Sequence, residues 1–460
     1  MRKFTVKPTA FHGKAGRVGS PHGDYTDWVW LGRLGESGPL TPIHFDLGTE
    51  HVVALFGKRG SGKSYALGSF LEGLCVTEAE SRVAQASRTH AVLLFDTLGV
   101  FQWMDQPLPE KPEGEELKKQ VSLRRGWELT SEPLDVQVYV PFGTRSSSTP
   151  PHHLDFAIVP ADLSASDLGY LLSLDIVQDR MGQLLNDAYM KVTIEGWTDQ
   201  QQKQTKPRPD YRVRDLLACI GNDRELVSVY APETRRAVLQ QLMTLERNPL
   251  FQDQGTSLPA LLKAGRLSVV VLSKLADELR LVLVTTLIRK ILQARVEASE
   301  NEKHLKVRVG LSSEDKAELG RAVASAVPPC WIAVDEAQNV LPSERKTTAT
   351  DVLVKLVREG RNFGISFVVT TQQPTAIDQR ILAQVDTIIA HKLTVQTDIE
   401  YVRKNLKSNL PTEVRYGTTT LGFDELMRTL DVGQALVSNT DADRSFIMDI
   451  RPRLSVHGGF

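Results

Sequence analysis

Residues 57 to 64 form the stretch whose residue types and spacing most clearly predict chemistry. Their sequence, GKRGSGKS, matches the pattern G-x-x-x-x-G-K-[ST] at every fixed position. Glycines at this spacing let backbone N–H groups turn inward around phosphate oxygens, and a helix that begins there adds its positive dipole end. Because an apolar run precedes the stretch and a run with helical spacing follows it, a chance match in a Gly-rich turn is the poorer interpretation. The sequence therefore predicts a loop that binds the phosphates of a nucleotide.

Two residues of this loop have distinct predicted roles. Lys63 would reach the β and γ phosphates of ATP, where it would act in catalysis, and Ser64 would hold Mg²⁺. ATP and Mg²⁺ are therefore the predicted cofactors. The predicted cofactor-binding residues are Gly57, Lys58, Arg59, Gly60, Ser61, Gly62, Lys63, Ser64 and Tyr65.

Hydrolysis of ATP needs a second acidic group beside Mg²⁺ and a group that orients water. The run WIAVDEAQ places Asp335 and Glu336 at the end of an apolar strand. Asp335 would lie beside the metal, and Glu336 would polarise the attacking water. The alternatives are an N-cap pair that opens the next helix and a rival acid, Asp96, which also ends a strand but lacks an adjacent carboxylate. We interpret Asp335 and Glu336 as the catalytic pair, which predicts an enzyme that turns ATP over.

Two further polar groups follow the acids along the chain. FVVTTQQP places Gln372 and Gln373 just past another strand, at the edge of the sheet where open α/β folds bind ligands. Gln372 is the better candidate for sensing the γ-phosphate or positioning water, and ordinary turn residues before Pro374 are the alternative. VREGRNFG carries Arg358 and Arg361 near a helix C-terminus, where cations are favoured by the helix dipole alone. An arginine finger that reaches a neighbouring subunit is the functional alternative, and the residues by themselves leave this choice open.

The elements that position these residues alternate between strands and helices. Runs rich in β-formers at 51–57, 90–101, 266–274 and 330–340 predict strands, and helical spacing follows several of them. This alternation predicts an α/β fold with a mostly parallel sheet, preceded by a short β module. The section from about 160 to 250 is expected to be helical. The polar sections at about 103–135 and 299–326 are expected to be a surface excursion and a loop or insertion.

Composition sets outer limits on function. The 460 residues carry a net charge of −1, which excludes a global basic surface of the kind that nucleic-acid coat proteins have. Three cysteines lie far apart, so neither a zinc ribbon nor a disulfide framework is expected, and His152-His153 is interpreted as part of a loop rather than a metal site. Because neither a signal peptide nor an uninterrupted apolar span is visible, we expect a soluble cytoplasmic protein without a membrane partner.

Several of these segments together resemble the HerA group of the HerA/FtsK motor ATPases. The resemblance is carried by GRLGESGPLTPIHFDLGTEHVVALFGKRGSGKSY, by DEAQNVLP, by REGRNFGISFVVTTQQPTAIDQRILAQVDTIIAHKLT and by the terminal IRPRLSVHGG. The segments ETRRAVLQQLMTLERNPLF and GRLSVVVLSKLADELR are similar to the helical insertion and returning strand of that group. The likeness covers nearly the whole chain.

The resemblance implies a RecA-like P-loop core of the ASCE type. Its implied parts are a short N-terminal β-barrel-like module (1–48), a first core segment (49–158), a helical insertion (159–255) and a second core segment (256–460). It also implies a homohexameric ring that translocates on double-stranded DNA through its pore. The implied partner is a nuclease such as NurA, a sirtuin-like protein or another anti-phage defence effector. The family pattern places the metal acid at Asp335, the catalytic glutamate at Glu336, the sensor at Gln372 and the arginine that acts in trans at Arg361.

The sequence also departs from that family. Its N-terminal module is shorter than usual, and its sensor motif reads Gln-Gln-Pro where Gln-Arg-Pro is commoner. Arg345 and Lys346 are candidates for contact with the DNA backbone, with a solvated loop as the stronger alternative. A nucleotide-gated scaffold that regulates a partner enzyme without sustained translocation is the alternative function. A conjugation or chromosome-partition pump ranks lower. Those proteins usually carry membrane helices or a DNA-reading winged-helix domain, and neither is visible in this sequence.

Overall fold

The computed structural model divides the chain into two compact units, each described by itself. The first unit comprises residues 1–138, 258–273 and 290–460, and the second comprises 139–257 and 274–289. The structure describes residues 2–3, 10–12, 15–19, 26–35, 41–78, 81–307, 312–340, 348–406, 413–416, 419–439 and 444–459. Among these residues, no helix is long and apolar enough to cross a membrane.

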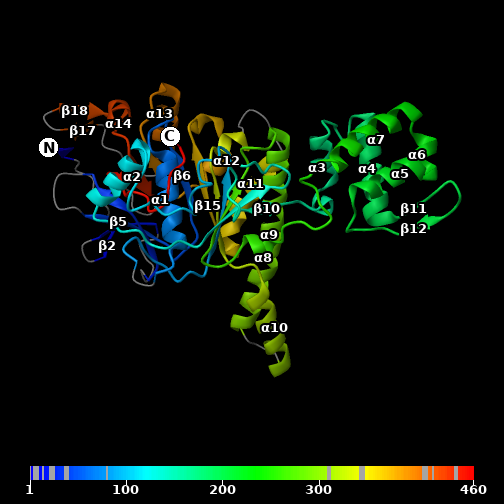
Figure 1. Cartoon of the computed structure of the whole chain (residues 1–460), viewed down its shortest axis with the longest axis horizontal. Helices are drawn as coiled ribbons and strands as arrows, with labels where there is room; N and C mark the ends of the chain where they lie inside the picture. The colour runs from blue at the N-terminus through cyan, green and yellow to red at the C-terminus, as the bar shows by residue number, and fades with distance from the viewer. Residues whose placement is uncertain are drawn as a thin grey trace. The chain divides into compact units, whose positions relative to one another are not determined.

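A parallel sheet forms the centre of the first unit (Figure 1). Six neighbouring strands run parallel in the order β13, β8, β14, β15, β6 and β16. Their residues are almost all buried, which explains why each reads as an unbroken apolar run rather than an alternating one. Their bounds are Leu267–Val271 (β13), Ala91–Asp96 (β8), Cys330–Val334 (β14), Ile365–Thr371 (β15), Val52–Phe56 (β6) and Thr387–Ala390 (β16).

Beyond β16 the same sheet continues with mostly antiparallel strands. The order is β19, β20, β4, β5, β3 and β2, so the N-terminal strands extend the central sheet past β20. Their bounds are Gln434–Asn439 (β19), Arg444–Ile450 (β20), Trp28–Leu34 (β4), Pro42–Asp46 (β5), Ala15–Val18 (β3) and Ala10–His12 (β2). Outside this path, β7 (Ala84–Gln85) pairs with β4, and β1 (Arg2–Lys3), β17 (Glu413–Tyr416) and β18 (Thr419–Gly422) form a small sheet.

The helices of the first unit connect these strands. The first helix, α1, begins directly after the phosphate-binding loop and contacts both β6 and β15. The helices are α1 (Lys63–Cys75), α2 (Glu115–Gly126), α8 (Leu258–Leu261), α10 (Ser313–Ser325), α11 (Thr348–Glu359), α12 (Gln379–Leu382), α13 (Gln396–Asn405) and α14 (Phe423–Thr429), with 3₁₀ turns at Ala337–Asn339, Gly360–Phe363 and Pro374–Ala376.

The second unit is largely helical, as expected for residues 160 to 250. Its helix α7 begins with Pro232, which suits a first helical position because its missing N–H needs no partner there. The unit contains β10 (Leu154–Phe156), a 3₁₀ turn at Pro160–Asp162, α3 (Ala165–Leu171), α4 (Arg180–Met190), a π-helix at Lys191–Glu195, β11 (Trp197–Thr198), β12 (Gln204–Thr205), α5 (Val213–Asn222), α6 (Arg224–Val229) and α7 (Pro232–Glu246). Two elements, β9 (Val136–Pro141) and α9 (Asp277–Val307), span the boundary between the units.

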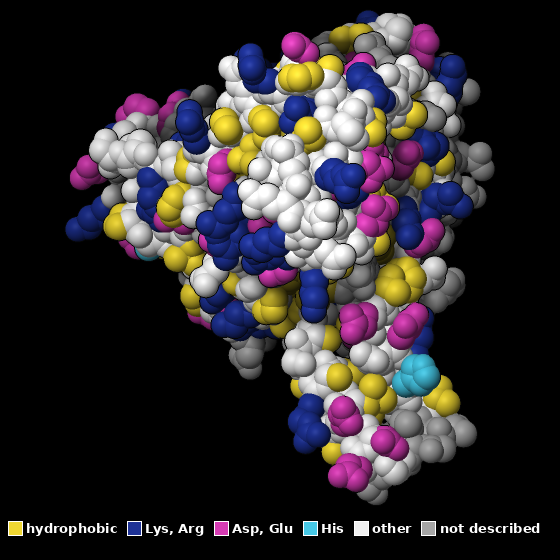
Figure 2. Space-filling view, turned by 90° about the vertical axis from the view of Figure 1, so that its right-hand side faces the viewer, with side chains coloured by type: hydrophobic (Ala, Val, Ile, Leu, Met, Phe, Trp, Pro, Cys, Tyr) yellow, Lys and Arg dark blue, Asp and Glu magenta, His cyan; other side chains and the backbone are white. Residues whose placement is uncertain are grey.

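The fold class predicted from the sequence is confirmed, but one local expectation was partly wrong. The section 299–326, expected to be a loop or insertion, contains the end of α9 and all of α10 rather than a loop. The polar section 103–135, expected to be a surface excursion, contains the mostly exposed helix α2. Figure 2 shows acidic and basic side chains mixed over the projection that α10 and the end of α9 form. None of the described side chains of α10 is buried, so no apolar stripe marks it as a helix. It is instead started by a capping box, in which Ser312 Oγ accepts from the Asp315 backbone N–H at 3.1 Å.

A buried ionic cluster ties the C-terminal segment to α1. The Glu72 carboxylate accepts hydrogen bonds from the backbone N–H groups of Leu454 and Ser455 and is paired with Arg451 and Arg453. The exposed fraction of all three charged side chains is 0%. The terminal IRPRLSVHGG segment, which the sequence marked only by resemblance, is therefore fixed along the helix that follows the phosphate-binding loop.

We predict that Glu72→Gln lowers the free energy of unfolding by about 3–5 kcal/mol, because it leaves two buried guanidinium groups without their anion. Urea denaturation followed by tryptophan fluorescence measures this loss. Glu115→Gln is the matched control, because its side chain is 79% exposed and its ion pair should contribute no more than about 1 kcal/mol. Equal stability of the two variants would contradict a stabilising role for the cluster.

Asp96 ends β8 and binds the turn that follows it. Its Oδ1 accepts from the backbone N–H groups of Gly99 and Val100, at 2.8 and 3.1 Å, and its Oδ2 accepts from that of Phe101 at 2.9 Å. Burial and, second, the nearby Asp335 raise the pKa of Asp96 to about 7, against the lowering effect of these three hydrogen bonds. The local role of this rival acid is therefore to hold a turn.

A carboxyl group with a higher pKa in the folded state than in the unfolded state binds its proton more tightly when folded. The contribution of Asp96 to the free energy of unfolding should therefore fall as the pH rises from about 4 to 7. We expect the wild type to lose stability relative to Asp96→Asn over this range, as measured by urea denaturation at several pH values. If the wild type instead gains stability relative to the variant, the backbone hydrogen bonds outweigh burial and the expected sign is wrong.

Candidate active site

The phosphate-binding loop lies at the carboxyl end of β6 and leads directly into α1. Gly62, the last residue before the helix, has φ +101°, which residues with a side chain rarely adopt. At Gly57 an added Cβ would lie 2.5 Å from Ser61 Oγ and 2.8 Å from His391 Cβ, so only glycine fits this tight approach. The side chains of Lys58 and Arg59 are exposed, whereas Lys63 is buried. Loop and helix N-terminus together have the arrangement that the predicted phosphate-binding site requires.

The two predicted acids lie at the end of β14, with β15 between that strand and β6. Lys63 Nζ forms a short ion pair with Glu336 Oε1 and lies 4.0 Å from Asp335 Oδ1. Gln372, just past β15, donates from Nε2 to the same Glu336 oxygen at 2.8 Å. Four residues from the loop and two strands, predicted separately from the sequence, are therefore brought together in the structure.

Thr370 is a site residue that sequence reasoning missed. Its hydroxyl donates to Asp335 Oδ1 at 2.8 Å and accepts from the Glu336 backbone N–H at 3.1 Å. Lys63 Nζ also lies 3.5 Å from this oxygen. The available signal was a threonine pair at the end of an otherwise apolar strand. Thr370 holds both acids in place from the strand that lies between them and the loop.

Gln338 was also missed. Its amide nitrogen donates to Glu336 Oε2 at 2.7 Å, and its amide oxygen accepts from the Thr371 hydroxyl at 2.8 Å. Both oxygens of Glu336 are therefore held by side-chain amides, one from Gln338 and one from Gln372. Glu336 has φ +48°, a left-handed conformation that is rare for a residue with a side chain and recurs at functional sites.

The acids differ in electrostatics. Burial raises the pKa of Asp335 to about 6, while Lys63 lowers it and Glu336 raises it. Burial alone would also raise the pKa of Glu336, but the charge and hydrogen bond of Lys63, together with the two glutamine amides, bring it below its ordinary value. Glu336 is therefore an anion at neutral pH.

The residues present fit a magnesium–nucleotide complex. Asp335 Oδ2 is buried and has no hydrogen-bond partner within the part of the chain that the structure describes. A carboxylate oxygen in that state suits a divalent cation or its water. Asp335 and the partly exposed Ser64 would hold Mg²⁺, and the loop N–H groups with Lys63 would hold the phosphates.

The remaining predicted residues lie apart from this group. The Tyr65 hydroxyl accepts from the backbone N–H of Arg453 at 3.0 Å, so it contacts the C-terminal segment. The Gln373 side chain is exposed, which favours Gln372 as the site residue. Arg345 and Lys346 lie outside the described residues.

Arg361 lies at the opposite edge of the parallel sheet from the phosphate-binding loop. Its Nη2 donates to Asp386 Oδ2 and to the Gln384 carbonyl, both at 2.9 Å. The same Asp386 oxygen accepts from the backbone N–H of Val52, the first residue of β6. The phosphate-binding loop instead follows Phe56, the last residue of that strand. Because β6 spans five residues, about 16 Å, Arg361 is far from the nucleotide site of its own chain.

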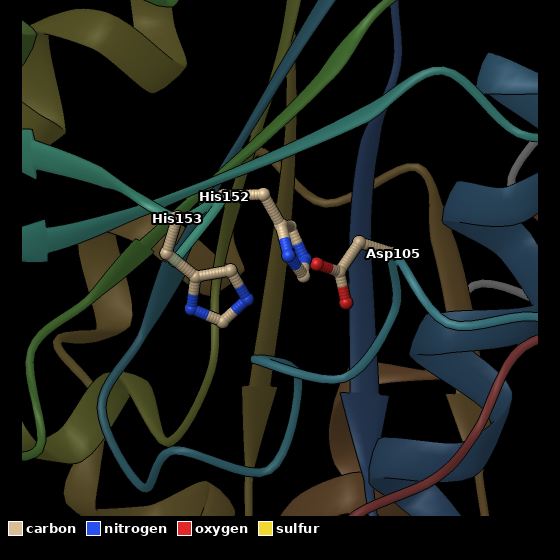
Figure 3. A group of neighbouring side chains, drawn as sticks. All are labelled: Asp105, His152 and His153. Carbon is tan, nitrogen blue, oxygen red and sulfur yellow. The ribbon is translucent and has the colours of Figure 1, made fainter. Parts of the chain in front are cut away.

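His152 and His153 lie in the turn before β10, as predicted. Their rings meet edge to face with centroids 4.9 Å apart (Figure 3). Of the side chains labelled in that figure, Asp105 belongs to the first unit and the two histidines to the second. Within the second unit the pair is an aromatic contact beside β10.

Comparison with known proteins supplies the family. The family described as "Helicase HerA, central domain" matches residues 29–291, more than half of the 460. The chain is 27% identical over 177 residues to the DNA double-strand break repair helicase HerA of Pyrococcus furiosus, covering 37% of this chain and 32% of that protein. It is 26% identical over 176 residues to the protein of the same name from Sulfurisphaera tokodaii, covering 38% of this chain and 30% of that protein. The chain spans about a third of the length of these curated relatives.

A solved structure supports the same fold over a wider span. VirB4 of Thermoanaerobacter pseudethanolicus aligns with 96% of this chain and 97% of its own, at a TM-score of 0.52 and 12% identity. At that identity the likeness concerns the fold alone. The range matched by the family includes the phosphate-binding loop and the largely helical second unit. On this basis the chain belongs to the HerA helicase family.

Proposed function

We propose that this chain is an ATP-hydrolysing motor that forms a ring and moves double-stranded DNA through it. The observation that carries the proposal is the convergence of Lys63, Asp335, Glu336 and Gln372 beside the phosphate-binding loop. A site that only binds nucleotide needs no second carboxylate held by two amides. The names of the relatives, DNA double-strand break repair helicases, support duplex DNA as the track.

Different residues of the chain have different roles in hydrolysis. When bound, the magnesium–nucleotide complex supplies the bond to be broken and a divalent charge that offsets the phosphates. Lys63 exchanges its contact with Glu336 for the terminal phosphates. Glu336, thus released, is free to accept a proton from a water molecule. Gln372 and Gln338 keep its carboxylate oriented while Lys63 moves away.

The finer parts of the proposal are a homohexamer and a partner enzyme. A ring is supported by the position of Arg361, which is 40% exposed and lies at the sheet edge away from its own nucleotide site. An arginine there contributes to hydrolysis only across a head-to-tail contact between copies, and such contacts form a ring when the rotation between neighbours closes. A nuclease of the NurA type, or a sirtuin-like or other defence effector, is the partner class that we propose.

We predict that linear duplex DNA raises steady-state ATP turnover several-fold. Glu336→Gln should lower turnover at least about 100-fold with and without DNA, because it removes the group that accepts the proton. A coupled ATPase assay on the purified chain measures both. If turnover requires Glu336 but ignores DNA, the motor proposal fails for the isolated chain and a nucleotide-gated scaffold replaces it.

We predict that Arg361→Ala lowers turnover by about 1,000-fold or more while changing the free energy of unfolding by no more than about 1 kcal/mol. Arg358→Ala, at an exposed arginine of the same helix end, is the control and should retain turnover.

A mixing experiment tests whether Arg361 acts in trans. Arg361→Ala keeps its carboxylates and Glu336→Gln keeps its arginine, so mixed rings contain some complete sites. We expect the mixture to hydrolyse ATP although neither variant does so alone. A mixture as inactive as its components would exclude an arginine finger supplied by the neighbouring copy.

A further inference from the structure

The strand order assigns the two ends of a nucleotide to different sides of the phosphate-binding loop. Glu336 and Gln372 follow β14 and β15, which lie on one side of β6. The strands β16 and β19 lie on the other side. A nucleotide whose terminal phosphate faces Glu336 therefore extends its nucleoside over the segments that follow β16 and precede β19.

The turn Asp431–Gly433, which precedes β19, contacts the phosphate-binding loop from that side. The Gly433 backbone N–H donates to the Ser61 carbonyl at 3.3 Å. An added Cβ on Gly62 would lie 3.1 Å from the Gly433 nitrogen, so the turn packs closely against the loop. The turn is therefore a wall of the site.

Backbone and side-chain hydrogen bonds hold this turn in place. The Gln434 backbone N–H donates to the Asp431 carbonyl at 3.0 Å, and the Asp431 N–H donates to Gln434 Oε1 at 3.2 Å. Gln434 Nε2 donates to Asp449 Oδ1 at 2.8 Å, and the Ile450 N–H donates to the Gly433 carbonyl at 2.8 Å. The turn is thus anchored to β20 as well as to itself.

The His391 side chain lies between the turn Asp431–Gly433 and the phosphate-binding loop and contacts both regions. Its side chain passes the first and last glycines of the loop, with Cβ 2.8 Å and Cε1 3.8 Å from the Cβ positions that Gly57 and Gly62 would have. Its Nδ1 donates to the Gln434 carbonyl at 2.9 Å. Burial, with a smaller contribution from Lys63, lowers the pKa of His391 to about 4, so the ring is a neutral packing element.

Val432 stands at the tip of this anchored turn. With 76% of its surface exposed, it is the most exposed large hydrophobic side chain among the residues that the structure describes. A single exposed valine is ordinary on a protein surface, but this one is fixed beside the cradle that receives the phosphates. An apolar side chain in that position suits the face of a base or ribose, which binding would remove from water.

We propose that Val432 is a nucleoside-binding residue of this chain, packing against the base or ribose of ATP while the loop holds its phosphates. The inference rests on the proposed function, since it needs nucleotide in the cradle. It assigns the turn Asp431–Gly433 a role that the motif residues do not cover.

The test compares two probes with equal numbers of phosphates. Binding of MgADP and of magnesium pyrophosphate is measured by isothermal titration calorimetry for the wild type, for Val432→Ala and for Val307→Ala. Val307 is the matched control, an exposed valine at the end of α9 with 67% of its surface accessible. Val432→Ala should weaken MgADP binding about four- to fifteenfold, the loss expected for one or two buried methyl groups, and leave pyrophosphate binding within about twofold.

Three results would overturn the inference. Unchanged MgADP affinity in Val432→Ala shows that the side chain does not contact the nucleoside. Equal weakening of MgADP and pyrophosphate shows that the turn only shapes the loop. If the wild type binds neither probe, the proposed function fails as well, which separates that outcome from the first two.

Discussion

The buried ion pair between Lys63 and Glu336 is the interaction on which the site depends. Their side chains are 4% and 2% exposed, and removing two such charges from water costs several kcal/mol per ion unless they are well paired. With Asp335 also buried beside them, two acids face one cation. The site therefore carries an excess of negative charge that a divalent cation would offset, while Lys63 is the group suited to the phosphates. The same charges that make the site costly to bury suit it to the magnesium–nucleotide complex that we propose it binds.

The sheet offsets this desolvation cost by placing the charged groups at neighbouring strand ends, where they pair with one another. The carboxyl ends of β6, β14 and β15 lie at one edge because the strands are parallel and adjacent, with Val334 in register with Val369 and Thr371 with Phe56. Each strand thus delivers one part of the site: the loop, the acids, and Thr370 with Gln372. The hydroxyl of Thr370 binds the Asp335 carboxylate and the backbone N–H of Glu336, so both acids are positioned before any ligand arrives.

Much of the site could be predicted from the sequence because its parts are local patterns. Lys63, Asp335, Glu336 and Gln372 each follow an apolar run, and such runs end at the same edge of a parallel sheet. Gln338 and His391 could not be assigned, since a glutamine in a turn or a histidine after a strand has no spacing that names its partner. The residues that bind Glu72 lie more than 370 positions away in the chain. The helix α10 was missed because its side chains stay in solvent, so only its capping residues distinguish it from a loop.

The position of Arg361 follows from the same parallel sheet. The length of β6 separates side chains at the amino ends of the strands from side chains at their carboxyl ends. Asp386 holds Arg361 at the amino edge through the start of β6, while the phosphates belong to the carboxyl edge. A single copy therefore has the phosphate-binding loop at one end of its parallel strands and a 40% exposed arginine at the other. The arginine finger that we propose would need a second copy arranged head to tail, and hydrolysis in one subunit would then depend on the position of the next.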